Sequence, residues 1–111
     1  MSPRPIISTA KVKFWFEDRK GRAFFGEGAA KLFEAIDRHK SISVASERIG
    51  MSYRYALHRI SIAEERSGRK LVERFRGGGA KGGAHLTEQG RLFLQRYMHA
   101  KRLLEQVATS A

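Results

Sequence analysis

Residues 41–70 read SISVASERIGMSYRYALHRISIAEERSGRK, and this stretch decides the expected fold. The hydroxyls of Ser41 and Ser43 suit the start of a short helix, which Gly50 would end. Ser52 comes only two residues later and predicts the start of a longer helix. Apolar residues recur at helical spacing in both segments and would face one core: Ile42, Ala45, Ile49, Ala56, Leu57, Ile60 and Ala63. Two helices joined by so tight a turn predict a helix-turn-helix.

The segment after these helices is expected to form a β-hairpin. Residues 71–75 have an extended pattern, residues 77–83 hold five glycines in seven positions, and residues 84–86 would form the returning strand. Beside a helix-turn-helix, such a hairpin is a wing. Arg74, Arg76 and Lys81 would lie on the wing or at its tip, where they suit contacts with phosphates or a minor groove. A plain flexible loop is the alternative.

Further elements are expected on both sides of this region. Residues 11–26 place two aromatic runs around a polar turn at 18–21, which predicts an N-terminal hairpin with Phe14 and Phe16 on one face and Trp15 on the other. A helix after residue 28 would end near residues 39–40. Its apolar residues share one face: Ala29, Leu32, Phe33 and Ile36. Thr87 would cap a last helix over residues 88–108.

The order strand, strand, helix, helix, helix, strand, strand, helix predicts one mainly helical α+β domain over residues 1–111. The fold expected of this domain is a winged helix-turn-helix. The N-terminal hairpin occupies about residues 11–26, the helix-turn-helix 41–66, the wing 70–87 and the long C-terminal helix 88–108.

Composition indicates the kind of partner. The chain has 22 Lys and Arg against 11 Asp and Glu, a net charge of +11, and nucleic acid is the polyanion that such a field is most expected to attract. With no cysteine, disulfides, thiolate zinc sites and cysteine nucleophiles are excluded. The four histidines lack metal-ligand spacing, so we expect no metal, no cofactor and no enzyme. No apolar run is long enough for a signal peptide or a membrane span, so we expect a soluble, cytoplasmic, nucleoid-associated protein.

The longer helix carries the candidate contacts with bases. With Ile60 at the centre of its buried side, Arg54, Tyr55 and His58 lie opposite, where such side chains can contact base edges in a major groove. Glu64 and Glu65 are interpreted as a surface pair. We expect a DNA-binding surface made of Ser43, Ser52, Tyr53, Arg54, Tyr55, His58, Arg59, Arg74, Arg76 and Lys81. An ordinary solvated helix face is the alternative.

The last helix carries a candidate dimer contact. Five of its residues alternate by four and three, the spacing of a coiled-coil seam of about two heptads: Phe93, Tyr97, Ala100, Leu104 and Val107. The seam could pack on its own domain or on a second copy. We expect a homodimer, because a helix-turn-helix protein usually binds two half-sites about one DNA turn apart.

Residues 41–74, the glycine-rich tip and HLTEQGRLFLQRY at 85–97 resemble the N-terminal DNA-binding domain of molybdate-dependent (ModE-type) transcriptional regulators, part of the wider LysR-like winged-helix group. The upstream string at 13–43 is similar to it as well. The resemblance implies a dimeric transcription factor of prokaryotic type that uses residues 52–59 for the groove and the wing for the backbone.

Members of that family bind molybdate or tungstate through further C-terminal domains. This chain ends after the long helix, so we expect a stand-alone form without the molybdate-binding domains. Its signal would come from a separate sensor protein or from its abundance alone. The function predicted is sequence-specific regulation of transcription as a dimer on double-stranded DNA, with a link to molybdate or metal metabolism left open. The alternative is a nucleoid-type architectural protein that coats DNA without base preference.

Overall fold

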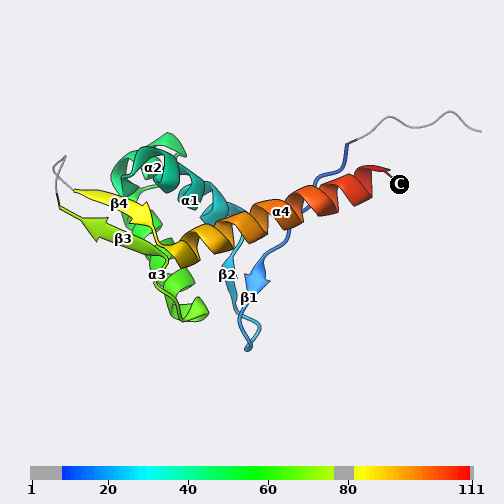
Figure 1. The fold of residues 1–111 in the computed structure, drawn as a ribbon, viewed down its shortest axis with the longest axis horizontal. Coiled ribbons are helices and arrows are strands. Elements are labelled where there is room, and N and C mark those ends of the chain that lie inside the picture. Colours follow the sequence, from blue (N-terminus) through cyan, green and yellow to red (C-terminus); the bar gives the residue numbers. More distant parts are fainter. Residues whose placement is uncertain (1–8, 77–81, 111) are drawn as a thin grey trace, which may run out of the picture.

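The computed structural model describes residues 9–76 and 82–110, and Figure 1 shows how their elements are arranged. In chain order they are β1 (Phe16–Glu17), β2 (Ala23–Phe25), α1 (Glu27–His39), α2 (Ile42–Arg48), α3 (Tyr53–Ser67), β3 (Val72–Phe75), β4 (Gly83–Leu86) and α4 (Glu88–Ser110). This is the predicted element order. The mainly helical α+β class is confirmed, with α4 ending two residues later than expected.

Three of the predicted helix starts are confirmed by their capping bonds. The Ser41 hydroxyl accepts a hydrogen bond from the Val44 amide at 3.1 Å. Ser52 accepts one from the Tyr55 amide at 3.1 Å, and Thr87 accepts one from the Gly90 amide at 3.1 Å. Each bond satisfies an amide that the first turn of a helix leaves without a partner.

Ser43 is wrong as a second cap. It lies inside α2, half-buried, and its carbonyl accepts a hydrogen bond from the Ser46 hydroxyl at 2.9 Å. The single cap at Ser41 is sufficient to begin this short helix.

The core lies where α1, α2, α3, the wing and the N-terminal hairpin meet. The four predicted apolar residues of α1 are all buried, with at most 1% of their surface exposed. Ala56, Ile60 and Ala63 bring the inner side of α3 to the same core, while Leu57 is half-buried at its margin. The wing adds residues from both strands: Val72, Ala84 and Leu86.

The N-terminal hairpin is confirmed, with strands shorter than the aromatic runs. β1 and β2 are antiparallel, and Phe16 lies opposite Phe25. The Asp18 carboxylate closes the turn, because its Oδ1 accepts hydrogen bonds from the amides of Lys20 and Arg22, each at 2.9 Å. As predicted, Phe14 and Phe16 share one face of the hairpin. The structure shows that this face packs against the core, whereas Trp15 is 54% exposed.

Helix α4 is the longest element. In Figure 1 it starts at the base of the wing, runs past the hairpin and continues beyond the three-helix cluster. The beginning of the described chain lies beside its far end, where the Ala10 amide donates a hydrogen bond to the Thr109 hydroxyl at 3.0 Å.

Candidate nucleic-acid interface

The outer face of α3 has the geometry that the sequence predicts. Arg54, Tyr55 and His58 are exposed, and the Tyr55 and His58 rings are neighbours with centroids 6.4 Å apart. Arg59 lies half-buried on the flank of this face. The face therefore presents a guanidinium, a phenol and an imidazole along the exposed side of α3.

Tyr53 lies differently from the other predicted contacts on α3. It is half-buried against the core, and its hydroxyl accepts a hydrogen bond from Arg74 Nη2 at 3.0 Å. Both residues are among the predicted DNA contacts. In the structure they also contact each other, and the bond joins the start of α3 to the wing.

The two strands of the wing, β3 and β4, are antiparallel and pair without a bulge. Val72 lies opposite Leu86 and Arg74 lies opposite Ala84. Val72 is buried in the core, and the chain then extends outward along the wing, where Arg74 and Arg76 are exposed. Lys81, the third predicted cation of the wing, lies outside the described residues.

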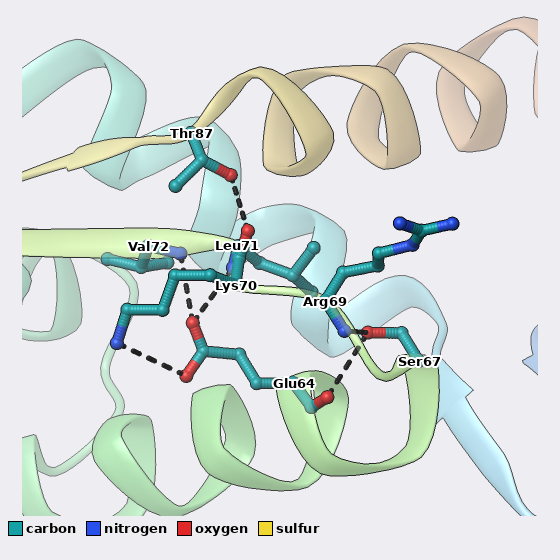
Figure 2. Close-up of polar contacts among 7 residues, drawn as sticks. All are labelled: Glu64, Ser67, Arg69, Lys70, Leu71, Val72 and Thr87. Carbon is teal, nitrogen blue, oxygen red and sulfur yellow. Dashed lines mark hydrogen bonds and ion pairs between the residues drawn. The ribbon is translucent and has the colours of Figure 1, made fainter.

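Glu64 fixes the base of the wing to α3 (Figure 2). Its Oε2 accepts hydrogen bonds from the Leu71 amide at 2.8 Å and from the Val72 amide at 3.1 Å. Its other oxygen lies 3.9 Å from Lys70 Nζ. The interpretation of Glu64 as half of a surface pair is wrong, because its side chain is only 20% exposed and turns toward the wing. Glu65 is the exposed member.

Thr87, at the start of α4, also holds the base of the wing. Its hydroxyl donates to the Lys70 carbonyl oxygen at 2.6 Å, and its amide donates to the Leu71 carbonyl oxygen at 2.9 Å. The first residues of the wing are thus held between α3 and the start of α4. The wing cannot turn about its base without breaking these bonds.

The predicted seam of α4 is divided. Tyr97 is 2% exposed and stacks on Phe14, with ring centroids 4.6 Å apart, so it belongs to the core of its own domain. Phe93 is half-buried against the same core. The burial raises the pKa of the Tyr97 hydroxyl, with a further contribution from the negative charges of Glu27 and Glu105.

The remaining seam residues lie further along α4. Ala100 is half-buried, whereas Leu104 and Val107 are 45% and 69% exposed. Leu92 and Leu103 are also exposed, although the predicted seam omits them. An extended apolar surface exists on α4, but Tyr97 is not part of it, because the N-terminal hairpin already covers that residue.

Metal binding and membrane insertion are two functions on which the described residues bear. Among residues 9–76 and 82–110, no three His, Asp or Glu side chains gather closely enough to hold a metal ion. In the same part of the chain, no helix has both the length and the apolar character needed to cross a membrane.

A known protein family matches most of the helical region of this chain. The sequence model for "Bacterial regulatory helix-turn-helix protein, lysR family" matches residues 28–91, from the first turn of α1 to the start of α4. The chain belongs to the LysR family. Membership confirms the predicted LysR-like helix-turn-helix. The N-terminal hairpin and most of α4 lie outside the matched residues.

A relative of this LysR-family chain supports the narrower resemblance. The molybdenum-pterin-binding protein MopA of Rhodobacter capsulatus is 30% identical over 94 residues, covering 85% of this chain. The chain spans only 34% of the length of MopA. The similarity agrees with the resemblance to molybdate-dependent regulators.

Solved structures agree with the fold of this LysR-family domain. The CbnR DNA-binding domain in a complex with DNA has a TM-score of 0.53 and 27% identity, covering 73% of this chain and 84% of that one. The BenM DNA-binding domain with benA site 1 DNA has a TM-score of 0.54 and 21% identity, covering 73% of this chain and 85% of that one.

Proposed function

We propose that this LysR-family chain binds double-stranded DNA as a homodimer and regulates transcription in the cytoplasm. In this proposal, α3 enters the major groove and the wing contacts the sugar-phosphate backbone. One observation carries it: Arg54, Tyr55 and His58 share the exposed face of α3, while Glu64 holds the wing at a fixed place beside that helix.

The chemistry of the α3 face suits base recognition. An arginine can donate two hydrogen bonds to guanine O6 and N7, and a histidine can donate or accept at a base edge. Ser52 brings the positive end of α3 to the same surface, which favours a phosphate. Ser43 and Arg59 would flank the contact, and Arg76 and Lys81 would add phosphate contacts from the wing.

The far half of α4 supports a dimer. Leu103, Leu104 and Val107 are exposed there on a segment that extends beyond the three-helix cluster (Figure 1). Leu92 continues the apolar surface toward the wing. A second copy would bury these side chains and would set two α3 helices for two half-sites.

The dimer can be tested on one helix. Leu103→Glu combined with Leu104→Glu should give a monomer in sedimentation equilibrium, because two charges would be buried in an apolar contact. Met98 is also an exposed apolar residue of α4, but it lies on a different side of the helix. Met98→Glu should therefore leave the dimer intact. A wild-type chain that sediments as a monomer at all concentrations would contradict this part of the proposal.

The similarity to MopA supports a link to molybdenum. We propose that the regulated genes serve molybdenum metabolism and that a separate sensor protein supplies the oxyanion signal. Mapping bound sites across the genome would test the first statement, since sites near unrelated genes alone would contradict it.

Selection of binding sites from random duplexes tests the main proposal. A shared sequence should emerge, and Arg54→Ala or His58→Ala should relax preference at single base positions, each at a cost of about 1–3 kcal/mol. Arg38→Ala removes an exposed arginine from α1 and should leave every base preference unchanged. If scrambled duplex competes as well as the selected site at physiological salt, the chain coats DNA without base preference and the proposal fails.

A further inference from the structure

A groove lies between the N-terminal hairpin, the end of α3 and the first half of α4. Its volume is about 1100 Å³, and its aromatic floor is formed by Phe16, Phe24 and Phe93. Phe24 and Phe93 meet edge to face there, with ring centroids 5.6 Å apart. The hairpin side of the groove precedes residue 28, where the match to the LysR family begins. The groove therefore lies at the edge of the matched residues, since Arg69 falls within them and the hairpin does not.

Four cationic side chains line this groove: Lys13, Arg19, Arg69 and Arg96. Within residues 9–76 and 82–110, none of these four side chains forms an ion pair or a hydrogen bond. The Arg96 guanidinium rests over the rings of Phe16 and Phe93, 5.1 and 5.6 Å from their centroids. These cation–π contacts orient the guanidinium but leave its N–H groups available to an acceptor.

The acidic residues nearby neutralise these cations only in part. Glu17 lines the groove and keeps its negative charge while its Oε2 accepts a hydrogen bond from Trp15 Nε1 at 2.8 Å, so one carboxylate faces four cations. Asp18 is engaged by Arg22, whose Nε lies 2.8 Å from Oδ2. The groove therefore combines a net positive charge with an aromatic floor.

We propose that this groove docks an acidic segment of a partner protein. Carboxylates of the segment would pair with the four cations, and an apolar side chain between them would cover the phenylalanine floor. Charge complementarity favours such an occupant, since the pairing satisfies both features of the surface at once. The volume exceeds the usual range of small-ligand sites, roughly 300–1,000 Å³, and suits a stretch of polypeptide.

A DNA duplex fits this groove less well than an acidic peptide. Glu64 turns toward the wing, whereas Arg66 turns to the hairpin, where its Nη1 donates to the Ala23 carbonyl oxygen at 2.6 Å. Residues two apart on a helix point to nearly opposite sides. The groove is thus on the flank of α3 away from the wing, and a duplex backbone has no apolar group to cover its aromatic floor.

The single tryptophan of the chain, Trp15, lines the groove and can report the interaction by its fluorescence. The probe is a seven-residue peptide of Glu and Asp with one Phe and one Leu, and its reference is the same peptide with Gln and Asn. The full chain should bind the acidic peptide at least tenfold more tightly. Arg69→Gln combined with Arg96→Gln should weaken binding roughly tenfold, as expected for two exposed charge contacts.

A matched variant separates docking from general attraction. Arg38→Gln combined with Arg48→Gln removes the same charge from a different hollow, between α1 and α2, and should leave the peptide affinity unchanged. Equal weakening by both double variants would overturn the proposal, as would equal binding of the two peptides. Displacement of the peptide by duplex DNA would assign the groove to DNA instead. A concentration-dependent loss of peptide binding that parallels dimer formation would assign it to a second copy.

Discussion

The Glu64 carboxylate accepts a hydrogen bond from the Leu71 amide at 2.8 Å, and this contact joins the end of α3 to the first residues of the wing. The Val72 amide shares the same oxygen. Leu71 and Val72 are both buried, and the carboxylate is the acceptor that satisfies their amides. Glu64 thus contributes to the relative placement of α3 and the wing, together with the bond between Tyr53 and Arg74.

Glu64→Ala should therefore destabilise the domain. Leaving buried amides without an acceptor costs about 1–3 kcal/mol, so the melting temperature should fall by roughly 10 °C. Thermal unfolding followed by circular dichroism measures the change. Glu65→Ala, at the exposed neighbouring position, should shift the melting temperature by no more than a degree or two. Equal effects of the two substitutions would show that the bonds to the wing contribute nothing.

The Tyr53 hydroxyl should help to position Arg74 for DNA. Tyr53→Phe removes the acceptor at 3.0 Å, so the long Arg74 side chain must be ordered when DNA binds. Ordering one such side chain costs about 0.5–1.5 kcal/mol, and the affinity for the selected duplex should fall a few-fold with no change in base preference.

A double-mutant cycle measured by fluorescence anisotropy checks this role of Tyr53. In an Arg74→Ala background, Tyr53→Phe should cause no further loss of DNA affinity. An undiminished loss in that background would mean that Tyr53 acts on DNA binding by another route.

The sequence predicts the parts of this molecule that local chemistry determines. The caps at Ser41, Ser52 and Thr87 and the buried stripe of α1 depend on residues within a turn or two of each other, so they could be found from spacing alone. Glu64 could not be found in this way, because its partner amides come close only after the chain turns back at Gly68, which has φ of +69°.

The role of Tyr97 also depends on distant sequence. The spacing along α4 is equally suited to packing within the domain and to a second copy, and only the position of Phe14 in the folded chain decides between them. For the α3 face, helical periodicity was sufficient, since Arg54, Tyr55 and His58 follow directly from which side Ile60 buries.

Two glycines in helices should respond oppositely to alanine. At Gly90 a Cβ would collide with the Leu71 carbonyl oxygen, since α4 begins directly against the base of the wing. Gly90→Ala should therefore destabilise the domain by about 1–3 kcal/mol, a typical cost of overpacking. At Gly28, in the first turn of α1, a Cβ would meet nothing within 4 Å.

Gly28→Ala should then stabilise the domain by up to about 1 kcal/mol, the difference in helix propensity between the two residues. Urea unfolding of both variants shows whether each substitution raises or lowers the free energy of unfolding. Stabilisation by Gly90→Ala would mean that α4 can move off the wing at no cost.

The N-terminal turn should be sensitive to acid through Asp18. Hydrogen bonds from the Arg22 amide, the Arg22 side chain and the Lys20 amide hold the pKa of this carboxyl below its ordinary value, against a partial desolvation that raises it. Because the pKa is lower in the folded chain, the ionised group contributes stability above its unfolded pKa of about 3.9, and the contribution is lost as the pH falls through the folded value.

At pH 7, Asp18→Asn should therefore speed hydrogen exchange at the Lys20 and Arg22 amides. At a second, acidic pH below the folded pKa, the difference from the wild-type chain should shrink, since protonated Asp18 also lacks the charge. Asp37, whose one described contact is an exposed pair with Lys40 at 3.4 Å, serves as the control, and Asp37→Asn should leave exchange in the turn unchanged at both pH values. A difference between wild type and Asp18→Asn that grows on acidification would contradict the assigned direction of the pKa.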